Sequence, residues 1–187
     1  MLPAGYPTEC ERRAATRSGI EYLIRPIRPD DLEREYEFVR GLSEQTLYNR
    51  LMYAVQEPTD ALLKPLVNID YQRHMALIAL MPVPDATGGA ERERIVGVAR
   101  YAIDAADRQH EFAVVVADEW QGHGIGTTLL RNLFEYARGR GLRRLVGTVF
   151  PSNERMLSLA RRLGLEVRTS EDDASLIALS QDFTGPA

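Results

Sequence analysis

One stretch, residues 111–130, constrains the fold more than any other part of this chain. It opens with an apolar run rich in valine, which is typical of a strand covered on both faces. Apolar residues then recur at three- and four-residue spacing across 129–137, which predicts an amphipathic helix. The connecting turn holds Gly122, Gly124 and Gly126, and glycine lets a backbone turn tightly because it tolerates positive φ. The stretch therefore predicts a buried strand, a glycine-rich turn and a helix.

Such a turn predicts a phosphate site, because backbone N–H groups at a helix N-terminus attract anions. The two best-known phosphate motifs fit poorly. A P-loop needs lysine directly after its last glycine, where this chain has Thr127. A dinucleotide fingerprint needs glycine or alanine at Thr127, and an acidic residue where the next strand instead runs into Phe150 and Pro151. A tight turn with no ligand is the remaining alternative, although three glycines make a costly connector.

A third pattern fits better. Gln121-x-x-Gly124-x-Gly126 after an apolar strand resembles the pyrophosphate loop of the GNAT N-acetyltransferases. Downstream, Asn153 opens a predicted helix that ends in Leu163-Gly164-Leu165, similar to the second signature of that family. Two motifs in the right order are more specific than either alone. The segments 24–31, 42–50 and 111–114 are also similar to the acetyltransferase domains of bacterial protein lysine acetyltransferases, and the resemblance covers about residues 21–183.

The element pattern and this resemblance predict an α/β GNAT fold. The sequence predicts strands at 21–29, 75–81, 95–103 and 143–150, a last hairpin at 165–168 and 176–179, and helices after Asp30, Ser43, Pro58 and Asn153. The expected architecture is a mixed central sheet of about six to seven strands flanked by helices, antiparallel in its first half. A strand–helix–strand connection implies a parallel pair, here splayed at an acetyl-CoA cleft beyond its carboxyl ends.

Length and composition indicate one globular domain over 20–187, preceded by an N-terminal arm over 1–19 that is mobile or serves oligomerisation. Hydrophobic residues make up 44% and charged residues 27%, with no membrane-length run and no signal pattern. The single cysteine, Cys10, cannot form an internal disulfide, which favours a cytoplasmic location. A net charge of −4 argues against nucleic-acid binding and mildly favours cationic substrates. A homodimer is left open.

The resemblance implies acetyl-CoA as co-substrate and no metal. Backbone N–H groups of the glycine-rich turn would hold its pyrophosphate, the valine strand would pair with its pantetheine arm as another strand does, and Asn153 would hold the arm from the opposite side. The expected cofactor-binding residues are Val114, Val115, Val116, Gln121, Gly122, His123, Gly124, Ile125, Gly126, Thr127 and Asn153.

Acetyl transfer to an amine also needs a base, because a lysine amine has a pKa of about 10.4. We expect Glu111, at the start of the valine strand, to be this base, since protein-acetylating relatives commonly carry a glutamate there. The alternative is an exposed charge at a strand end. A backbone N–H near Val116 would stabilise the oxyanion. Ala160 stands where many relatives have a tyrosine as general acid, so the thiolate, with a thiol pKa near 8.5, would leave without one.

The acceptor is the open question at this stage. The leading expectation is a protein lysine, and the alternatives are a small amine, such as a polyamine, an amino acid or a drug, or a non-catalytic acyl-CoA-binding module. Helices in the first half line the acceptor groove in this family, which makes Tyr48, Arg50 and Tyr53 candidate specificity residues. The alternative reading is that the aromatic residues pack between helices and that Arg50 is solvated.

Overall fold

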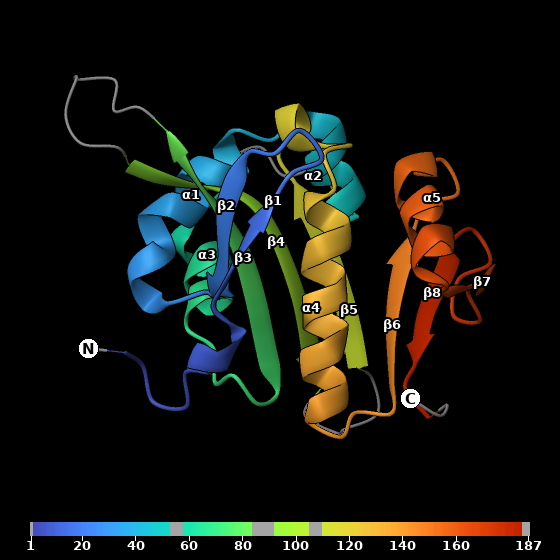
Figure 1. Ribbon diagram of the computed structural model, residues 1–187. Helices are drawn as coiled ribbons and strands as arrows, with labels where there is room; N and C mark the ends of the chain where they lie inside the picture. The colour runs from blue at the N-terminus through green and yellow to red at the C-terminus, as the bar shows by residue number, and fades with distance from the viewer. Residues whose placement is uncertain (1, 53–57, 84–91, 105–109, 185–187) are drawn as a thin grey trace.

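The computed structural model describes residues 2–52, 58–83, 92–104 and 110–184. Within these ranges, eight strands form one sheet in the order β1-β2-β3-β4-β5-β6-β8-β7, with helices on both faces (Figure 1). The strands are β1 (Arg12–Ala15), β2 (Glu21–Pro26), β3 (His74–Val83), β4 (Arg92–Ile103), β5 (His110–Val116), β6 (Arg144–Val149), β7 (Glu166–Thr169) and β8 (Ile177–Asp182). The helices are α1 (Leu32–Arg40), α2 (Glu44–Leu51), α3 (Asp60–Val67), α4 (Ile125–Gly139) and α5 (Glu154–Leu163), with 3₁₀ turns η1 (Thr8–Cys10), η2 (Pro29–Asp31) and η3 (Asp118–Trp120).

The two faces of the sheet carry two separate hydrophobic cores. Side chains alternate along a strand, so Met75 and Leu77 of β3 pack under α4, while Ala76 and Ile78 pack under α1 and α3. This two-sided burial explains why β3 reads as a continuous apolar run rather than an alternating one. None of the helices in the described part of the chain is both long enough and apolar enough to cross a membrane.

Several elements begin where the sequence predicted. Ser43 caps α2 by accepting a hydrogen bond from Thr46 N, and Asn153 caps α5 by accepting one from Met156 N. Gly164 ends α5 in the left-handed conformation with φ of +75°. The predicted last hairpin is confirmed as the antiparallel pair β7 and β8.

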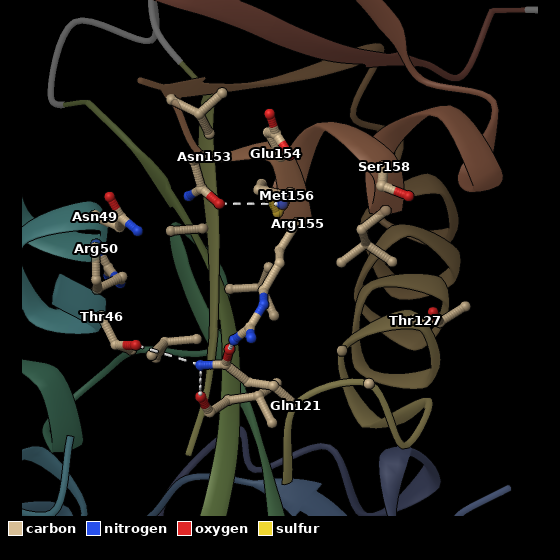
Figure 2. A pocket seen from close by; sticks show the side chains of 18 of the residues that line it. Thr46, Asn49, Arg50, Gln121, Thr127, Asn153, Glu154, Arg155, Met156 and Ser158 are labelled. Atoms are coloured by element: carbon tan, nitrogen blue, oxygen red, sulfur yellow. Dashed lines mark hydrogen bonds between the residues drawn. The ribbon is translucent and has the colours of Figure 1, made fainter. Parts of the chain in front are cut away.

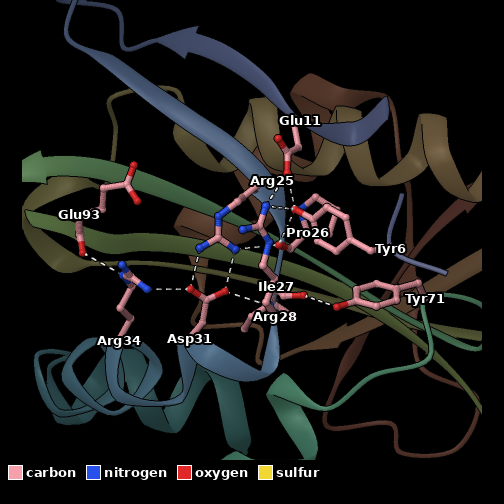
Figure 3. Close-up of polar contacts among 10 residues, drawn as sticks. All are labelled: Tyr6, Glu11, Arg25, Pro26, Ile27, Arg28, Asp31, Arg34, Tyr71 and Glu93. Carbon is pink, nitrogen blue, oxygen red and sulfur yellow. Dashed lines mark hydrogen bonds and ion pairs between the residues drawn. The ribbon is translucent and has the colours of Figure 1, made fainter. Parts of the chain in front are cut away.

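The first segment of the chain differs from expectation. Residues 12–15, predicted to belong to an irregular arm, form β1, and this edge strand pairs antiparallel with β2. That addition raises the strand number above the expected six to seven. The segment before it is also tied to the domain: Tyr6 packs edge-on against Tyr71, and its hydroxyl donates to Glu11, which pairs with Arg28 at 2.6 Å (Figure 3). The four residues of β1, Arg-Arg-Ala-Ala, lack an alternating hydrophobic pattern, so the sequence carries no strand signal there.

The expected parallel pair is confirmed in β5 and β6, and it creates the site. These strands align at Glu111 and Val146, the one aligned pair in the described residues, and then diverge toward their C-terminal ends (Figure 1). All other neighbouring strands are antiparallel. The sheet therefore opens beside β5, where the glycine-rich turn follows.

Candidate active site

A cavity of about 1020 Å³ fills the gap between β5 and β6. Its walls come from α2, β5, the glycine-rich turn, the first turn of α4, β6 and the start of α5 (Figure 2). Of the expected cofactor-binding residues, those on the cavity wall are Val114, Val115, Val116, Gln121, Gly122, Gly124, Gly126, Thr127 and Asn153. His123 and Ile125 do not line it. The His123 ring contacts Gln121 O at 3.1 Å and the Trp120 ring. Ile125 is the first residue of α4, and its side chain is buried in the core with 1% exposure.

Strand β5 directs backbone groups into this cavity. Ala117 N donates to Val96 O of β4 at 2.9 Å. Alternate residues of an antiparallel pair direct their backbone groups to opposite sides, so the N–H and C=O groups of Val114 and Val116 face away from β4 and into the cavity. Val115 directs its backbone to β4 and contributes only its side chain. Val116 O accepts from Gln121 Nε2 at 3.0 Å, so a strand-like ligand can pair with the backbone of Val114 and with the N–H of Val116.

The glycine-rich turn forms the phosphate end of the cavity. Gly122 and Gly124 have φ of +83° and +97°, a region that favours glycine, and Gly124 is the N-cap of α4. The first N–H groups of α4 lack intrahelical partners, so this end of the helix attracts anions. A Cβ at Gly126 would lie 3.4 Å from Val116 Cγ2 and 3.5 Å from Leu159 Cδ2, filling space next to the strand. This cradle fits a pyrophosphate.

Gln121 connects three elements at the end of the cavity next to the glycine-rich turn. Its Nε2 donates to Val116 O at 3.0 Å and to Thr46 Oγ1 of α2 at 3.3 Å, and its Oε1 accepts from Arg155 of α5 (Figure 2). On the opposite wall, the Asn153 side chain accepts from Met156 N at 3.1 Å through Oδ1, and its amide nitrogen points away from α5 (Figure 2). Gln121 and Asn153 thus lie on either side of the opening.

Asp118 is a site residue that the sequence did not reveal. Its carboxylate accepts from Ser43 N at 2.9 Å, Ser43 Oγ at 2.8 Å and Thr46 Oγ1 at 2.7 Å. Burial alone would raise its pKa, but the hydrogen bonds from Ser43 and Thr46 outweigh burial and hold the pKa below its usual value. Asp118 therefore fixes the N-terminus of α2 beside the cavity. These contacts join residues far apart in the sequence, so no local motif could predict them.

Glu111 lies just outside the cavity. Its side chain is exposed, and Phe112, the next residue, is the first of β5 to line the cavity wall. By strand alternation Glu111 shares a face with Ala113 and Val115, the face that α1, α2 and α3 cover farther along the sheet. Glu111, the expected general base, thus lies at the narrow end of the opening, at the residue where β5 and β6 begin to diverge.

An aromatic pair spans the opening on the α2 side. The rings of Tyr48 on α2 and Phe150 after β6 stack with centroids 5.0 Å apart and planes 2° from parallel. Arg50 lines the cavity beside this pair, whereas Tyr53 lies outside the described residues. Ala160 of α5 is fully buried in the core and supplies no hydroxyl to the site.

Comparison with known proteins assigns this site to a family. The family described as Acetyltransferase (GNAT) family matches residues 49–165, which include both motifs and the valine strand. The chain belongs to the GNAT family. An acetyltransferase of Pseudomonas aeruginosa is 37% identical over 159 residues, covering 85% of this chain and 82% of that protein. This GNAT protein is therefore an N-acetyltransferase that uses acetyl-CoA as co-substrate.

Two further matches concern Pat proteins. The acetyltransferase Pat of Mycolicibacterium smegmatis is 32% identical over 149 residues, which cover 79% of this chain but 42% of Pat. This chain therefore corresponds to less than half of that relative. The crystal structure of the GNAT domain of PAT from S. lividans has a TM-score of 0.82 at 24% identity, covering 95% of this chain and 99% of that domain. That likeness shows that the two share the GNAT fold.

Proposed function

We propose that this GNAT enzyme acetylates lysine side chains of proteins. Support comes from the similarity of residues 24–31 and 42–50 to bacterial protein lysine acetyltransferases and from the match to Pat. The observation that carries the proposal is the shape of the cavity. It runs from the glycine-rich turn along β5 to Asn49 and Arg50 of α2, so a co-substrate from one side and an acceptor from the other can meet beside β5.

In this proposal Glu111 is the general base. The acceptor ammonium must lose a proton before its nitrogen attacks the thioester carbonyl. Glu111 lies at the narrow end of the opening, on the face of the sheet that α2 covers. Because Glu111 is next to the cavity wall and not on it, one water molecule would relay the proton. The N–H of Val116, which faces the cavity, would donate to the oxyanion. As the thiolate leaves, the cationic amine nitrogen would lose its second proton to solvent, and the thiolate would take a proton from solvent, since Ala160 has no hydroxyl.

The binding roles of the cavity residues belong to the same proposal. The backbone of Val114 would pair with the pantetheine arm, and the Val116 N–H would face the thioester carbonyl. The turn from Gln121 to Thr127 would hold the pyrophosphate, and the Asn153 amide would donate to the arm from the α5 side. His123 and Ile125 would contribute backbone N–H groups only. We also expect the enzyme to work in the cytoplasm, where the free and buried Cys10 thiol stays reduced.

The proposal is tested by thiol release from acetyl-CoA with protein, peptide and small-amine acceptors in separate reactions. We expect release with lysine-containing proteins, and a Glu111→Gln variant should lose about 100-fold in kcat, the usual contribution of a general base, while it retains acetyl-CoA binding. The matched control is Glu33→Gln, an exposed glutamate on α1, which should keep full activity.

Three outcomes would contradict parts of this proposal. Release with small amines alone would replace the protein acceptor by a small-molecule acceptor. Unchanged turnover in Glu111→Gln would remove Glu111 as the base. Acetyl-CoA binding without release in any reaction would indicate a binding module.

A further inference from the structure

The turn between β1 and β2 packs against the glycine-rich turn, although the two are far apart in the sequence. The β1–β2 turn is held by Thr16, whose N–H donates to Ile20 O at 2.9 Å and whose Oγ1 accepts from Ile20 N at 3.0 Å. Next to it, Arg17 N donates to His123 O at 3.1 Å. This bond fixes the backbone of Arg17 beside the N-terminus of α4.

The Arg17 side chain then extends along Gly124. A Cβ at Gly124 would lie 3.7 Å from Arg17 Cγ and 4.0 Å from Arg17 Nε, so the absence of a side chain at Gly124 makes room for the arginine. Arg17 lines the cavity together with Gly122, Gly124 and Gly126. A cationic group is therefore located where the first N–H groups of α4 already favour an anion.

Within the described residues this guanidinium has no partner. Arg155 and Arg162 line the cavity as well, but Arg155 donates to Gln121 and Arg162 donates to Ser158 Oγ at 2.8 Å. Across the ranges that the structure describes, no carboxylate or other acceptor contacts the Arg17 guanidinium. Arg17 is exposed, so its charge is available to a ligand in the cavity.

We propose that Arg17 binds a phosphate of the acetyl-CoA co-substrate. Arginine suits this role because its planar guanidinium can donate two parallel hydrogen bonds to phosphate oxygens. The inference rests on the proposed position of the pyrophosphate at the glycine-rich turn, and it adds a residue that lies outside that turn. The N-terminal segment, expected as an arm, thereby becomes part of the co-substrate site through β1.

The test compares binding of CoA and dephospho-CoA by calorimetry at low ionic strength. The variant is Arg17→Gln, which keeps the aliphatic stem beside Gly124 but removes the charge. We expect CoA affinity to fall about tenfold or more, as for loss of one charge-assisted hydrogen bond. Arg17→Lys, which keeps the charge but not the planar guanidinium, should lose less affinity. The control is Arg13→Gln on β1, whose side chain is 82% exposed and does not line the cavity.

The two ligands identify the phosphate. A loss confined to CoA assigns Arg17 to the 3′-phosphate, and an equal loss with both ligands assigns it to the pyrophosphate. Wild-type affinity of Arg17→Gln for both ligands would overturn the inference, and so would a loss that Arg13→Gln shares. A wild-type enzyme that binds no CoA would instead contradict the co-substrate site itself, so the two failures are distinguishable.

Discussion

Single carboxylates in this enzyme have different roles that their environments explain. Glu111 is exposed at the start of β5, whereas Asp118 is held by three hydrogen bonds from Ser43 and Thr46. Glu35 of α1 is buried beside Arg100 at 3.5 Å, and burial raises its pKa. Of these three carboxylates Glu111 alone is exposed, as the proposed base requires, whereas the oxygens of Asp118 on the cavity wall already accept hydrogen bonds.

The lowered pKa of Asp118 predicts a pH-dependent contribution to stability. A carboxyl whose pKa is lowered by folding stabilises the protein above its unfolded pKa of 3.8 and loses this effect as pH falls through the folded pKa. Asp118→Asn should therefore lower the free energy of unfolding by about 1–2 kcal/mol at pH 7, because the amide is neutral and its NH2 group cannot accept the bond that the replaced carboxylate oxygen accepts. Urea unfolding at pH 7 and at pH 3 measures this difference.

The two pH values separate the charge of Asp118 from its shape. The difference between wild type and Asp118→Asn should shrink below pH 4, where the Asp118 carboxyl of the unfolded chain becomes protonated before that of the folded protein. A difference that stays constant down to pH 3 would contradict the argument. Asp172→Asn, in the exposed turn before β8, serves as the control and should match wild type at both pH values.

At the scale of elements, the spacing of β5 and β6 depends on one small residue. A Cβ at Gly147 of β6 would lie 3.0 Å from Phe112 Cζ and 3.1 Å from Phe112 O of β5. The Phe112 carbonyl belongs to the backbone and cannot move aside as a flexible side chain would. Glycine is otherwise unfavourable within a strand, so its presence here reflects the close approach of β5 just before the opening.

Gly147→Ala should therefore push the two strands apart. We expect a loss of about 1–3 kcal/mol in unfolding free energy, as for other overpacked sites, together with weaker acetyl-CoA binding because both strands line the cavity. Gly139→Ala is the matched control. Nothing lies within 4 Å of a Cβ at Gly139, the last residue of α4, so alanine should stabilise the enzyme by about 0.5–1 kcal/mol. Equal effects of the two substitutions would contradict this account.

Local signals explain which elements were predictable. The valine run, the glycine-rich turn and the caps at Ser43 and Asn153 depend on neighbouring residues, and the structure confirms these elements. β1 was missed because a short edge strand is stabilised by its partner β2 rather than by its own pattern. The contacts of Asp118 with α2 were not predicted because they join residues that are far apart in the sequence. Ile125 was expected to bind the cofactor through its backbone, and its side chain packs into the core.

At the scale of the whole molecule, the opening separates two parts of one sheet. The part from β1 to β5 is antiparallel throughout, and the part made of β6, β8 and β7 meets it at the single aligned pair Glu111 and Val146. Beyond that pair, contacts across the opening include the stack of Tyr48 on Phe150 and the bond from Arg155 to Gln121. A ligand that contacts β5 and α5 together would add a bridge between the two parts.

Acetyl-CoA should therefore stabilise the whole molecule and not only the glycine-rich turn. At 100 times its dissociation constant, a ligand adds about 2.7 kcal/mol to the unfolding free energy, which corresponds to a rise of roughly 5–10 °C in Tm for a chain of this length. Hydrogen exchange should slow in β6 and α5 as well as in β5, because Asn153 and Val116 would contact the same ligand. Pantetheine, which lacks phosphates, should protect β5 and α5 but leave the first turn of α4 unchanged. Protection by acetyl-CoA confined to α4 would contradict the bridging role, since the phosphates alone would then account for binding.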